Sequence, residues 1–441
     1  MPAPVIGYIP FDAGSTSEEA RWVRDRFACE VVIPPGLPRL NGNATVTSTS
    51  IEQTRDLVRD LLAADWLIAE GPAGLLWTAG LRRLGFKGGA TILPYLNPRR
   101  WQDVTSAAVY DRFRDPRDRV YLGSTPSARI YRRLGIQAQV GEPFGIDDRR
   151  FRPRPHAADV LRRLGIPRGR LLLFVGRAQA DKDLYRLLRT ALKARILFPD
   201  LRIAIASHVI DESYVAALRR ELGPASGVHL IERPGSEDLA DLYCVADVFA
   251  TAATSHFETF GRAPAEALAS GTPVVAPRYD GFAEVLAQPG GNLVGLAMDE
   301  SGPHAREDEL LRTIYDVLSA NERPPAAHVS AAAHRRFARS RTIELLGHVV
   351  GGTDAPPIDL SDASPIVLPE AWEDELRRLA ALPAGAALDR VWNGHRAPDE
   401  SGSSKLSMGN GQFVDAVRRA LCVTAPVRPG QPSAGGRGDA A

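Results

Sequence analysis

Short hydrophobic runs alternate along most of the chain with longer segments in which hydrophobic residues recur at a helical period. In the first third of the chain, the runs that predict β-strands are Val5–Ile9, Glu30–Ile33, Trp66–Ala69, Ala90–Leu93, Val120–Leu122 and Gln137–Val140. Several are hydrophobic at nearly every position, which is typical of parallel strands covered on both faces. The segments between them predict helices at Ser17–Phe27, Ile51–Ala63, Ala73–Leu84 and Ser127–Leu134. This alternation predicts a doubly wound, mostly parallel α/β sheet.

A second series of the same kind follows a charged, proline-containing segment at residues 145–155. Its predicted strands are Leu171–Val175, Arg202–Ala206, Val228–Ile231, Val248–Ala250, Pro273–Ala276 and Asn292–Val294. Later helices are predicted at Glu307–Ala320, Ser330–Leu346, 370–381 and 411–421. We therefore predict two Rossmann-like domains, residues 1–147 and 148–348, that face each other across a cleft. Residues 349–424 are predicted to be a helical extension that partly crosses back to the first domain, and 425–441 a disordered tail.

The overall composition narrows the range of partners and compartments. The chain has 54 basic and 53 acidic residues, which gives no electrostatic footprint for nucleic acid or an anionic membrane. No hydrophobic run approaches the ~20 residues of a membrane span, and the N-terminus lacks the layout of a signal peptide. The cysteines, Cys29, Cys244 and Cys422, form no C-x-x-C pair, which favours a reducing compartment. We expect a soluble, cytoplasmic protein.

The segment from Ser255 to Ala276 carries the strongest candidate chemistry. A predicted strand leads into a loop that ends at Gly261, and the helix that follows stops at Gly271. Gly261 allows backbone to approach a ligand closely. The helix N-terminus presents N–H groups and a partial positive charge, which suit a phosphate or sugar hydroxyls. Glu258 in the loop and Glu266 in the helix can face the same ligand.

This segment resembles the signature of family-4 (group 1) retaining glycosyltransferases of the GT-B fold. The resemblance lies in the spacing Glu258-x7-Glu266, with Phe260-Gly261 between the two carboxylates and Gly-x-Pro-Val-Val-Ala after them. Leu172–Lys182 resembles the strand-Gly-Arg-x4-Lys segment of that family. Weaker matches are Asp147-Asp148 with Phe151-x-Pro153, Asp238–Asp247, and Gly281-x2-Glu284 with Asp280 where a glycine often stands. The resemblance spans roughly residues 5–345 and is strongest over 145–295.

The resemblance implies a role for each matched residue. Arg177 and Lys182 would bind the diphosphate of the donor, one as a forked donor and the other as a compact charge. Only four of the 54 basic residues are lysines, so the presence of one at this position is informative. Glu258, with the backbone near Phe260 and Gly261, would hold the hexose hydroxyls. The resemblance further places Glu266 on the ribose hydroxyls, His256 on the donor sugar and the nucleotide base near Val228–Arg233, and it makes Glu258, Arg177 and Lys182 the catalytic residues.

The first domain matches the family less well. Its first loop, Phe11–Thr16, has one glycine where the family usually has two and a nearby histidine. Gly14 and Ser15 are expected to offer N–H groups to a phosphate. Three carboxylates near strand ends are candidate contacts for the acceptor, namely Asp12, Glu70 and Glu142. All nine histidines lie after residue 155, which excludes a histidine general base on this side.

The sequence lacks the motifs of other nucleotide-binding and metal-binding sites. No G-x-G-x-x-G follows a predicted strand, and no G-x4-G-K-[ST] is present. Asp181-Lys-Asp183 formally matches the D-x-D motif of metal-dependent glycosyltransferases, but it begins a helix at a phosphate-binding position. We expect neither a metal nor a cofactor, with a UDP- or GDP-sugar as the donor substrate.

The resemblance implies a retaining, metal-independent hexosyltransferase. The divergent, histidine-free first domain and the arginine-rich composition suggest a small-molecule acceptor of bacterial specialised metabolism. The product could be an O-, N- or S-glycoside. The missing histidine base favours the hypothesis of a thiol acceptor, as in the lincosamide-type S-glycosyltransferases of antibiotic biosynthesis. Two alternatives stay open: a sugar-nucleotide epimerase on the same fold, and a non-catalytic protein that binds sugar nucleotides. A homodimer is compatible with the sequence, whereas nucleic acid and a membrane span are not expected.

Overall fold

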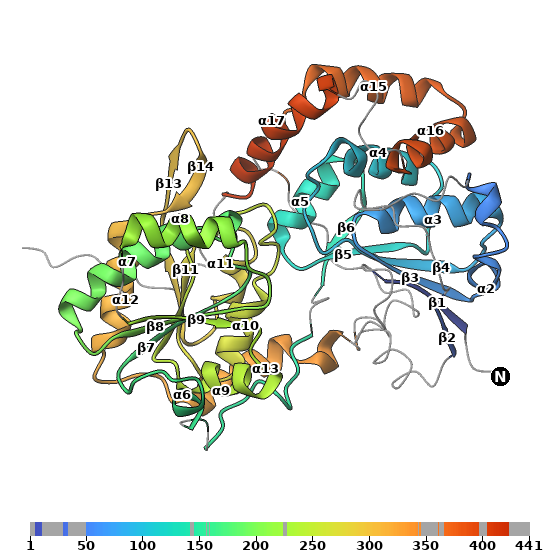
Figure 1. Cartoon of the computed structure of the whole chain (residues 1–441). Helices are drawn as coiled ribbons and strands as arrows, with labels where there is room; N and C mark the ends of the chain where they lie inside the picture. Colours follow the sequence, from blue (N-terminus) through green and yellow to red (C-terminus); the bar gives the residue numbers. More distant parts are fainter. Residues whose placement is uncertain are drawn as a thin grey trace, which may run out of the picture.

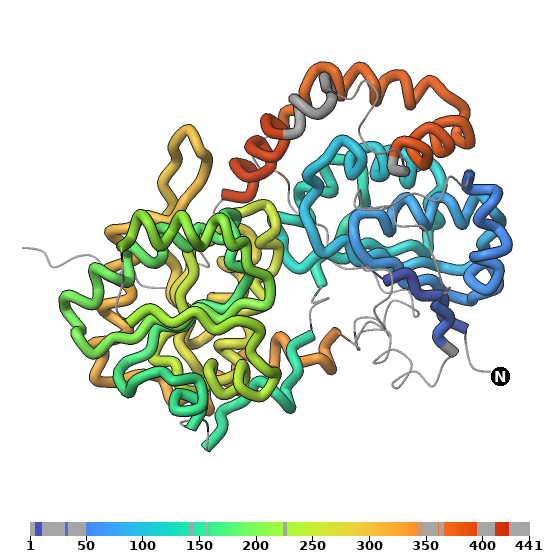
Figure 2. Tube along the Cα trace, viewed as in Figure 1, coloured from blue at the N-terminus to red at the C-terminus, as the bar shows by residue number. Residues whose placement is uncertain are grey.

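The computed structural model describes residues 5–10, 30–33, 50–141, 145–155, 157, 159–223, 227–342, 344, 360, 366–396 and 404–422. Two six-stranded sheets lie side by side, each with helices on its faces (Figure 1). We call the part with the sheet of lower residue numbers the first domain and the other the second domain. The path of the chain, in Figure 2, passes through the first domain, then the second, and returns over the first.

The first sheet has six parallel strands in the order β2-β1-β3-β4-β5-β6. They are β1 (Val5–Ile9), β2 (Glu30–Val32), β3 (Trp66–Glu70), β4 (Gly89–Leu93), β5 (Arg119–Leu122) and β6 (Ala138–Val140). Each predicted strand of this half is confirmed, with ends shifted by at most one residue. β4 is buried at every position, which explains why it reads as an unbroken hydrophobic run.

Helices η1 (Glu52–Thr54), α2 (Arg59–Leu62), α3 (Ala73–Leu84), α4 (Trp101–Tyr110) and α5 (Thr125–Arg133) accompany this sheet. The prediction of α3 is confirmed at both ends. The single helix predicted over Ile51–Ala63 is wrong, because a 3-10 turn and the short α2 replace it. Neither Ile51 nor Val58, which precede these two pieces, has a side chain that caps a helix. The helix predicted at Ser17–Phe27 lies outside the described residues.

The second sheet is also parallel, in the order β12-β11-β10-β7-β8-β9. Its strands are β7 (Leu171–Val175), β8 (Arg202–Ser207), β9 (Val228–Glu232), β10 (Val248–Ala250), β11 (Val274–Pro277) and β12 (Gly291–Val294). These predictions are likewise confirmed to within one residue. An antiparallel hairpin that the sequence did not predict, β13 (Leu296–Asp299) and β14 (Gly302–Ala305), projects from this domain (Figure 1).

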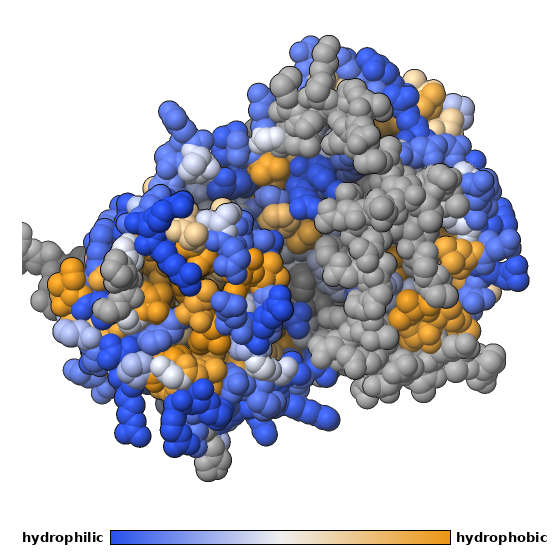
Figure 3. All heavy atoms as spheres, in the orientation of Figure 1, coloured by the Kyte–Doolittle hydropathy of each residue, from blue (hydrophilic) through white to orange (hydrophobic). Residues whose placement is uncertain are grey.

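The helices of the second domain surround its sheet (Figure 1). They are α6 (Asp159–Arg163), η2 (Ala180–Lys182), α7 (Leu184–Leu197), α8 (Glu212–Leu222), α9 (Ser236–Val245), α10 (Arg262–Ala269), α11 (Phe282–Val285), α12 (Glu307–Ser319) and α13 (Ala326–Phe337). Hydrophobic residues reach the surface of this domain in several patches between hydrophilic ones (Figure 3), and Ile196 and Leu197 at the end of α7 are among the exposed ones.

The C-terminal helices α15 (Glu370–Ala381), α16 (Ala384–Arg396) and α17 (Ser404–Ala420) lie over the first domain (Figure 1). Trp392 packs edge-on against Trp77 of α3, and Trp372 packs against Trp101 of α4. α17 contacts α4 and α5 of the first domain and the hairpin strand β14 of the second, so it packs against both domains. Residues 425–441, the predicted tail, lie outside the described part. No helix among the described residues is long and apolar enough to cross a bilayer.

Candidate active site

A cavity of about 430 Å³ lies between the domains, at the carboxyl ends of strands from both sheets. On the first-domain side it is lined by Tyr95 and Leu96, which follow β4. On the second-domain side it is lined by the end of β7, by Lys182 and by the segment 257–264. Open α/β sheets bind ligands at this place, because the loops that follow the strands gather there.

A larger cavity of about 710 Å³ lies between α7, α8 and β9. Its described lining residues are hydrophobic apart from Arg219, and they include Leu184, Val215 and Leu230. One charged group is a poor match for a diphosphate, which carries several negative charges. The interdomain cavity, although smaller, is therefore the candidate active site.

The cleft loop, which we define as residues 254–261, runs from β10 to α10 and forms one wall of the interdomain cavity. It ends at Gly261, whose φ of 95° lies in the left-handed region. A Cβ atom at Gly261 would lie 2.7 Å from the ring of Phe282. Both the conformation and the close contact require glycine, so the sequence fixes this turn locally. The turn brings the N-terminus of α10 to the cavity.

Lys182 and Glu258 form an ion pair inside the cavity. Lys182 ends the 3-10 turn η2 after β7, and Glu258 lies in the cleft loop, so two segments 76 residues apart meet here. Both side chains are largely buried, with 14% and 11% of their surface exposed. The structure thus brings together two of the three residues predicted to be catalytic, and it pairs them with each other.

Burial lowers the pKa of the Lys182 ammonium from 10.5 to about 8. Asp181 raises this pKa and Arg177 lowers it, both by smaller amounts. Below this pKa the ammonium is charged, and because it is buried, little water screens its attraction to an anion that enters the cavity. The cavity is therefore electrostatically suited to a polyanionic ligand.

Arg177, the third predicted catalytic residue, also lines the cavity. Its guanidinium donates to Gln179 at 2.7 Å and to Asp181 at 2.5 Å, and it lies 5.2 Å from the centre of the Phe257 ring. Asp181, the first aspartate of the D-x-D match, is thus occupied by this arginine. Arg177 is partly exposed, so it can turn from Asp181 toward a ligand.

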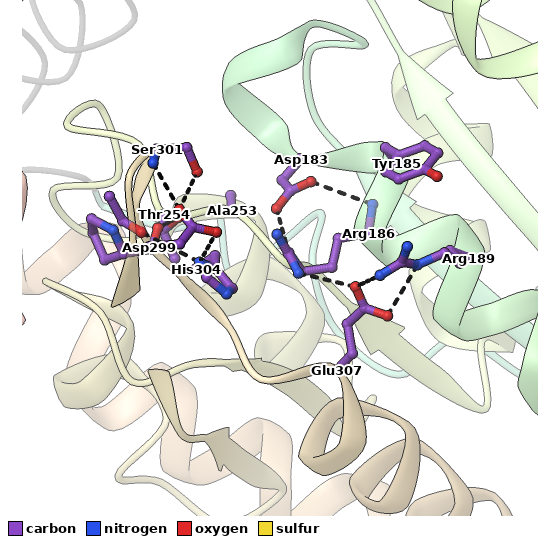
Figure 4. A network of polar contacts seen from close by, with 12 residues as sticks. Asp183, Tyr185, Arg186, Arg189, Ala253, Thr254, Asp299, Ser301, His304 and Glu307 are labelled. Carbon is purple, nitrogen blue, oxygen red and sulfur yellow. Dashed lines mark hydrogen bonds and ion pairs between the residues drawn. The ribbon is translucent and has the colours of Figure 1, made fainter. Parts of the chain in front are cut away.

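The turn that carries Lys182 is anchored by a polar network on α7 and α12 (Figure 4). Asp183, the second aspartate of the match, caps α7 by accepting from the N–H of Arg186. The Arg186 guanidinium binds Asp183 and Glu307, and Glu307 also binds Arg189. No group of three or more metal-ligating side chains occurs among the residues with described positions.

Glu266 lies inside α10 and is 8% exposed. The hydroxyl of Tyr243 donates to one of its oxygens at 2.9 Å, and Arg262 donates to the other at 3.2 Å. Burial raises the pKa of this carboxyl, while Arg262 and Tyr243 lower it. Glu266 does not line the cavity, so its contact with a ribose stays a prediction.

His256 and Phe260 belong to the cleft loop, and Phe260 lines the interdomain cavity, whereas His256 is not among its lining residues. The ring of His256 stacks on Phe257, and burial lowers its pKa to about 4, with Arg99, Arg418 and Arg177 acting in the same direction. His256 is therefore neutral at pH 7, and its Nε2 is buried without a partner. Phe260 is buried against Phe337. The predicted contact of His256 with the donor sugar is untested.

Arg233 lies at the end of β9 with a φ of 46° and an exposed side chain. Its N–H donates to the carbonyl of Ser207 at 2.7 Å, which continues the sheet beyond the strand. Arg233 is not among the residues that line the interdomain cavity. The prediction that the nucleotide base packs near Val228–Arg233 remains a prediction.

On the first-domain side, Glu70 ends β3 and is 5% exposed. It accepts hydrogen bonds from the hydroxyls of Tyr8 and Tyr95, the latter at 3.0 Å. Tyr95 lines the cavity, whereas Glu70 is not among the lining residues, so Glu70 is connected to the site through its hydrogen bond with the Tyr95 hydroxyl. The other first-domain candidates, Asp12, Gly14, Ser15 and Glu142, lie outside the described residues.

The loop between β4 and α4, residues 94–100, holds site residues that the sequence reasoning missed. Tyr95 lines the cavity with a φ of 62°, which is rare for a residue other than glycine. Asn97 binds the carbonyl of His256, and the Arg99 guanidinium lies 5.1 Å from the centre of the Phe257 ring. Within the described part of the chain, that guanidinium has no hydrogen bond or ion pair. The signal was the polar loop after a buried strand, which faces the cleft by topology.

Comparison with known proteins agrees with this architecture. Residues 161–323 match the sequence model of the family described as "Glycosyl transferases group 1". The curated D-inositol 3-phosphate glycosyltransferase of Thermobispora bispora is 30% identical over 258 residues, which is 56% of each chain. The enzyme of the same name from Thermobifida fusca is 35% identical over 207 residues, 44% of each chain. The chain thus spans about half the length of the curated relatives it matches.

Solved structures match the whole two-domain arrangement. Anabaena Alr3699/HepE in complex with UDP and glucose superposes with a TM-score of 0.62 and 17% identity, covering 79% of this chain and 99% of that one. WaaG, a glycosyltransferase involved in lipopolysaccharide biosynthesis, gives 0.56 and 15%, covering 79% and 100%. This chain therefore has the α/β GT-B fold of such glycosyltransferases, and its second domain carries the group 1 match.

Proposed function

We propose that the protein is a glycosyltransferase that moves a sugar from a nucleotide-diphosphate sugar to a small-molecule acceptor. The observation that carries this proposal is the convergence of Arg177, Lys182 and Glu258 on one interdomain cavity. The group 1 match over residues 161–323 supports it, and so do the HepE complexes with UDP and with UDP-glucose. We take UDP or GDP as the nucleotide of the donor.

The two cations account for the chemistry at the diphosphate. When the bond between the sugar and the diphosphate breaks, negative charge grows on the departing phosphate. Lys182 and Arg177 stabilise that charge in a cavity that excludes most water, so the reaction needs no metal ion in this proposal. Glu258 binds hydroxyls of the sugar, and the backbone near Phe260 and Gly261 binds others.

Donor binding also rearranges the ion pair. In the ligand-free cavity Lys182 and Glu258 satisfy each other. When the donor enters, the diphosphate takes Lys182 and the sugar hydroxyls take Glu258. Lys182 then stays paired with an anion and Glu258 stays hydrogen-bonded, so neither buried charge is left without a polar partner.

The acceptor side determines the class of product. Tyr95 and Glu70 place a phenol and a carboxylate there, and we propose that the phenol contacts the acceptor. By the resemblance to retaining glycosyltransferases, the departing phosphate itself takes the acceptor's proton and the sugar keeps its anomeric configuration in this proposal. The absence of histidine before residue 155 is consistent with this. The acceptor is a small molecule of bacterial specialised metabolism in this proposal, and it attacks the sugar through an oxygen, nitrogen or sulfur atom.

A thermal-shift panel of UDP-, GDP- and dTDP-sugars tests the donor. The true donor raises the melting temperature by an amount that grows with the logarithm of its concentration relative to its Kd, by mass action. Hydroxyl and thiol acceptors are then compared with that donor. Sugar isomers formed without any acceptor would indicate an epimerase, and binding without turnover would indicate a non-catalytic protein.

Variants test the site. Lys182→Ala and Glu258→Ala are expected to abolish turnover, because each removes one of the two groups that the donor engages. Lys193→Ala is the matched control, since Lys193 lies on α7, the helix that follows the turn with Lys182, is half exposed and pairs with Glu307 outside the cavity. Full activity in both cavity variants would show that the site lies elsewhere.

A further inference from the structure

Asp280 is a buried carboxylate of the second domain that reaches into the first. It follows β11, is 1% exposed, and adopts a φ of 43°. The hydroxyl of Ser124 donates to its Oδ1 at 2.5 Å, the hydroxyl of Ser127 donates at 3.2 Å, and the amide of Asn97 donates to its Oδ2 at 2.8 Å. All three donors belong to the first domain. We call these four residues the Asp280 cluster.

The cluster sits at the N-terminus of α5. Ser124 caps this helix by accepting from the N–H of Ser127, and Glu284 accepts from the N–H of Thr125 at 2.9 Å. Two carboxylates of the second domain therefore face the positive end of a first-domain helix, where negative charge is favourable. Burial raises the pKa of Asp280 to about 7, and the three donors oppose that rise.

The same cluster continues into the cleft loop. The amide nitrogen of Asn97 donates both to Asp280 and to the carbonyl of His256, at 3.2 Å. Asn97 is fully buried, and each of its two bonds uses an N–H directed at an acceptor, which fixes the orientation of the amide. Asn97 thus links the domain contact to the residue two positions before Glu258.

Further contacts hold the loop from both sides. The hydroxyl of Thr259 donates to the carbonyl of Tyr95 in the first domain. Gly281, next to Asp280, packs on the backbone of Thr259 and Phe260 so closely that a Cβ atom would lie 2.6 Å from it. The segment that carries Glu258 is therefore clamped between the first domain and the 280–281 turn.

We propose that Asp280 and Asn97 are positioning residues for donor-sugar recognition, which set the cleft loop in its binding conformation only when the two domains meet. This inference rests on the proposed function, because it concerns the sugar half of the proposed donor site. It implies that contact between the domains selects for the sugar and not for the nucleotide. The nucleotide diphosphate alone relies on Arg177 and Lys182, neither of which touches the cluster.

The substitution Asp280→Asn tests the chemistry of the cluster. In its ionised form, which prevails above about pH 7, Asp280 offers acceptors only, and three donors converge on it. An asparagine at 280 has one oxygen, so its NH₂ faces either the Ser124 and Ser127 hydroxyls or the NH₂ of Asn97. We expect the second arrangement, because the Ser124 hydroxyl already accepts from the N–H of Ser127. Asn97 must then turn its own oxygen toward residue 280, and its N–H no longer reaches the His256 carbonyl. The variant should lose the link to the cleft loop as well as interdomain stability.

A double variant separates the two effects. In Asn97→Asp/Asp280→Asn, the amide at 280 donates to the carboxylate at 97, which restores the bond between the domains. The carboxylate at 97 cannot donate to the carbonyl of His256, so the link to the cleft loop stays broken. Glu284→Ala is the opposite control, since it removes a domain contact at the same helix end without touching the loop.

The readout is the ratio of dissociation constants for UDP and UDP-glucose, measured by calorimetry beside the melting temperature of each variant. GDP and GDP-glucose replace these probes if the thermal-shift panel selects guanine. We expect Asp280→Asn to lower the affinity for UDP-glucose roughly fivefold relative to UDP, the effect of about one hydrogen bond. The double variant should regain most of the melting temperature but keep the altered ratio, whereas Glu284→Ala should melt lower with an unchanged ratio.

Two outcomes would overturn the inference. If the ratio changes in Glu284→Ala as much as in Asp280→Asn, the cluster acts through general stability. If the double variant restores the ratio together with the melting temperature, the link from Asn97 to His256 has no role in sugar recognition. Failure of the proposed function looks different, because wild-type protein would then bind neither the nucleotide nor its sugar, and the inference would fall with it.

Discussion

The charge of Lys182 is predicted to set the upper pH limit of donor binding. Burial lowers its pKa from 10.5 to about 8, a change worth about 3 kcal/mol. Because the pKa is lower in the folded state than in the unfolded state, the charged ammonium costs stability at every pH below about 8. That cost is relieved as the pH rises from about 8 to 10.5. Lys182 alone thus makes the fold more stable in alkaline solution.

Binding of a diphosphate follows the opposite trend, because it needs the charged ammonium. We expect the affinity for UDP to be highest near pH 7, where the terminal phosphate is ionised and Lys182 is charged, and to fall toward tenfold per pH unit above about pH 8, as the charged fraction of Lys182 declines. Calorimetric titration of UDP at several pH values measures this directly. A thermal-unfolding series over the same range should show the fold stable where binding is lost.

Lys182→Arg isolates the contribution of this residue, since an arginine stays charged throughout the range. The variant should bind UDP more weakly at pH 7, because a planar guanidinium does not fit a cavity shaped for a compact ammonium. Its affinity should nevertheless lack the alkaline decline. An affinity for UDP that declines equally in wild-type and Lys182→Arg protein would refute the reasoning, and so would wild-type turnover in the variant at neutral pH.

Three further predictions concern the frame around the cavity. Gly261→Ala should destabilise the fold by about 2–4 kcal/mol in thermal unfolding, because of the left-handed φ and the contact with Phe282. Gly394→Ala, at an exposed helical position with open space around it, should instead stabilise the fold by up to about 1 kcal/mol. Equal effects of the two substitutions would contradict this account of the turn. Arg418 donates to the carbonyls of Thr254, which begins the cleft loop, and of Ser301 and Pro303. Arg418→Ala should therefore lower the free energy of unfolding by about 1–3 kcal/mol and weaken UDP-glucose binding. An unchanged free energy of unfolding would show that water replaces these bonds. The raised pKa of Asp280 means that wild-type stability falls by up to about 4 kcal/mol as the pH rises from about 4 to 7, because Asp280 ionises in a buried place. Asp280→Asn lacks this titration, so the stability that it loses relative to wild type should be smaller above pH 7 than near pH 4; parallel pH profiles of unfolding for the two proteins would contradict it.

The sequence predicts the two sheets well, because their strands are covered on both faces. β4 and β7 are nearly continuous hydrophobic runs for that reason, and polar, glycine-containing segments mark their ends. The residues at the ends of β7 and β10 could also be predicted, since Arg177, Lys182 and Glu258 follow strands whose carboxyl ends meet at one edge. Residues that follow neighbouring strands of one sheet are brought together by its topology, so their proximity can be predicted from the pattern along the chain.

Helix α4 shows where such a pattern fails. It lies between the first sheet and the C-terminal helices, so Asp103, Thr105 and Ser106 are buried along with its hydrophobic side chains. A helix covered on most sides has no polar face, and its sequence then lacks the amphipathic period that identifies a helix. The covering layer itself, α15–α17, comes from residues more than 200 positions later.

The contacts between the domains could not be predicted for a related reason. Asp280, Asn97 and Ser124 are ordinary polar residues in ordinary loops, and only the relative placement of two separately folded sheets brings them together. The pairing of Lys182 with Glu258 could not be predicted either, because the motif around each residue indicates contact with a ligand and not with the other residue. In the folded chain they neutralise each other.

The most direct test of the donor site is a crystal structure of the protein with a bound nucleotide sugar, UDP-glucose being the first choice. The account predicts that the diphosphate lies within hydrogen-bond distance of Arg177 and Lys182, that Glu258 has left Lys182 for the sugar hydroxyls, and that the sugar faces Tyr95. A diphosphate bound elsewhere, with the Lys182–Glu258 pair intact, would contradict it.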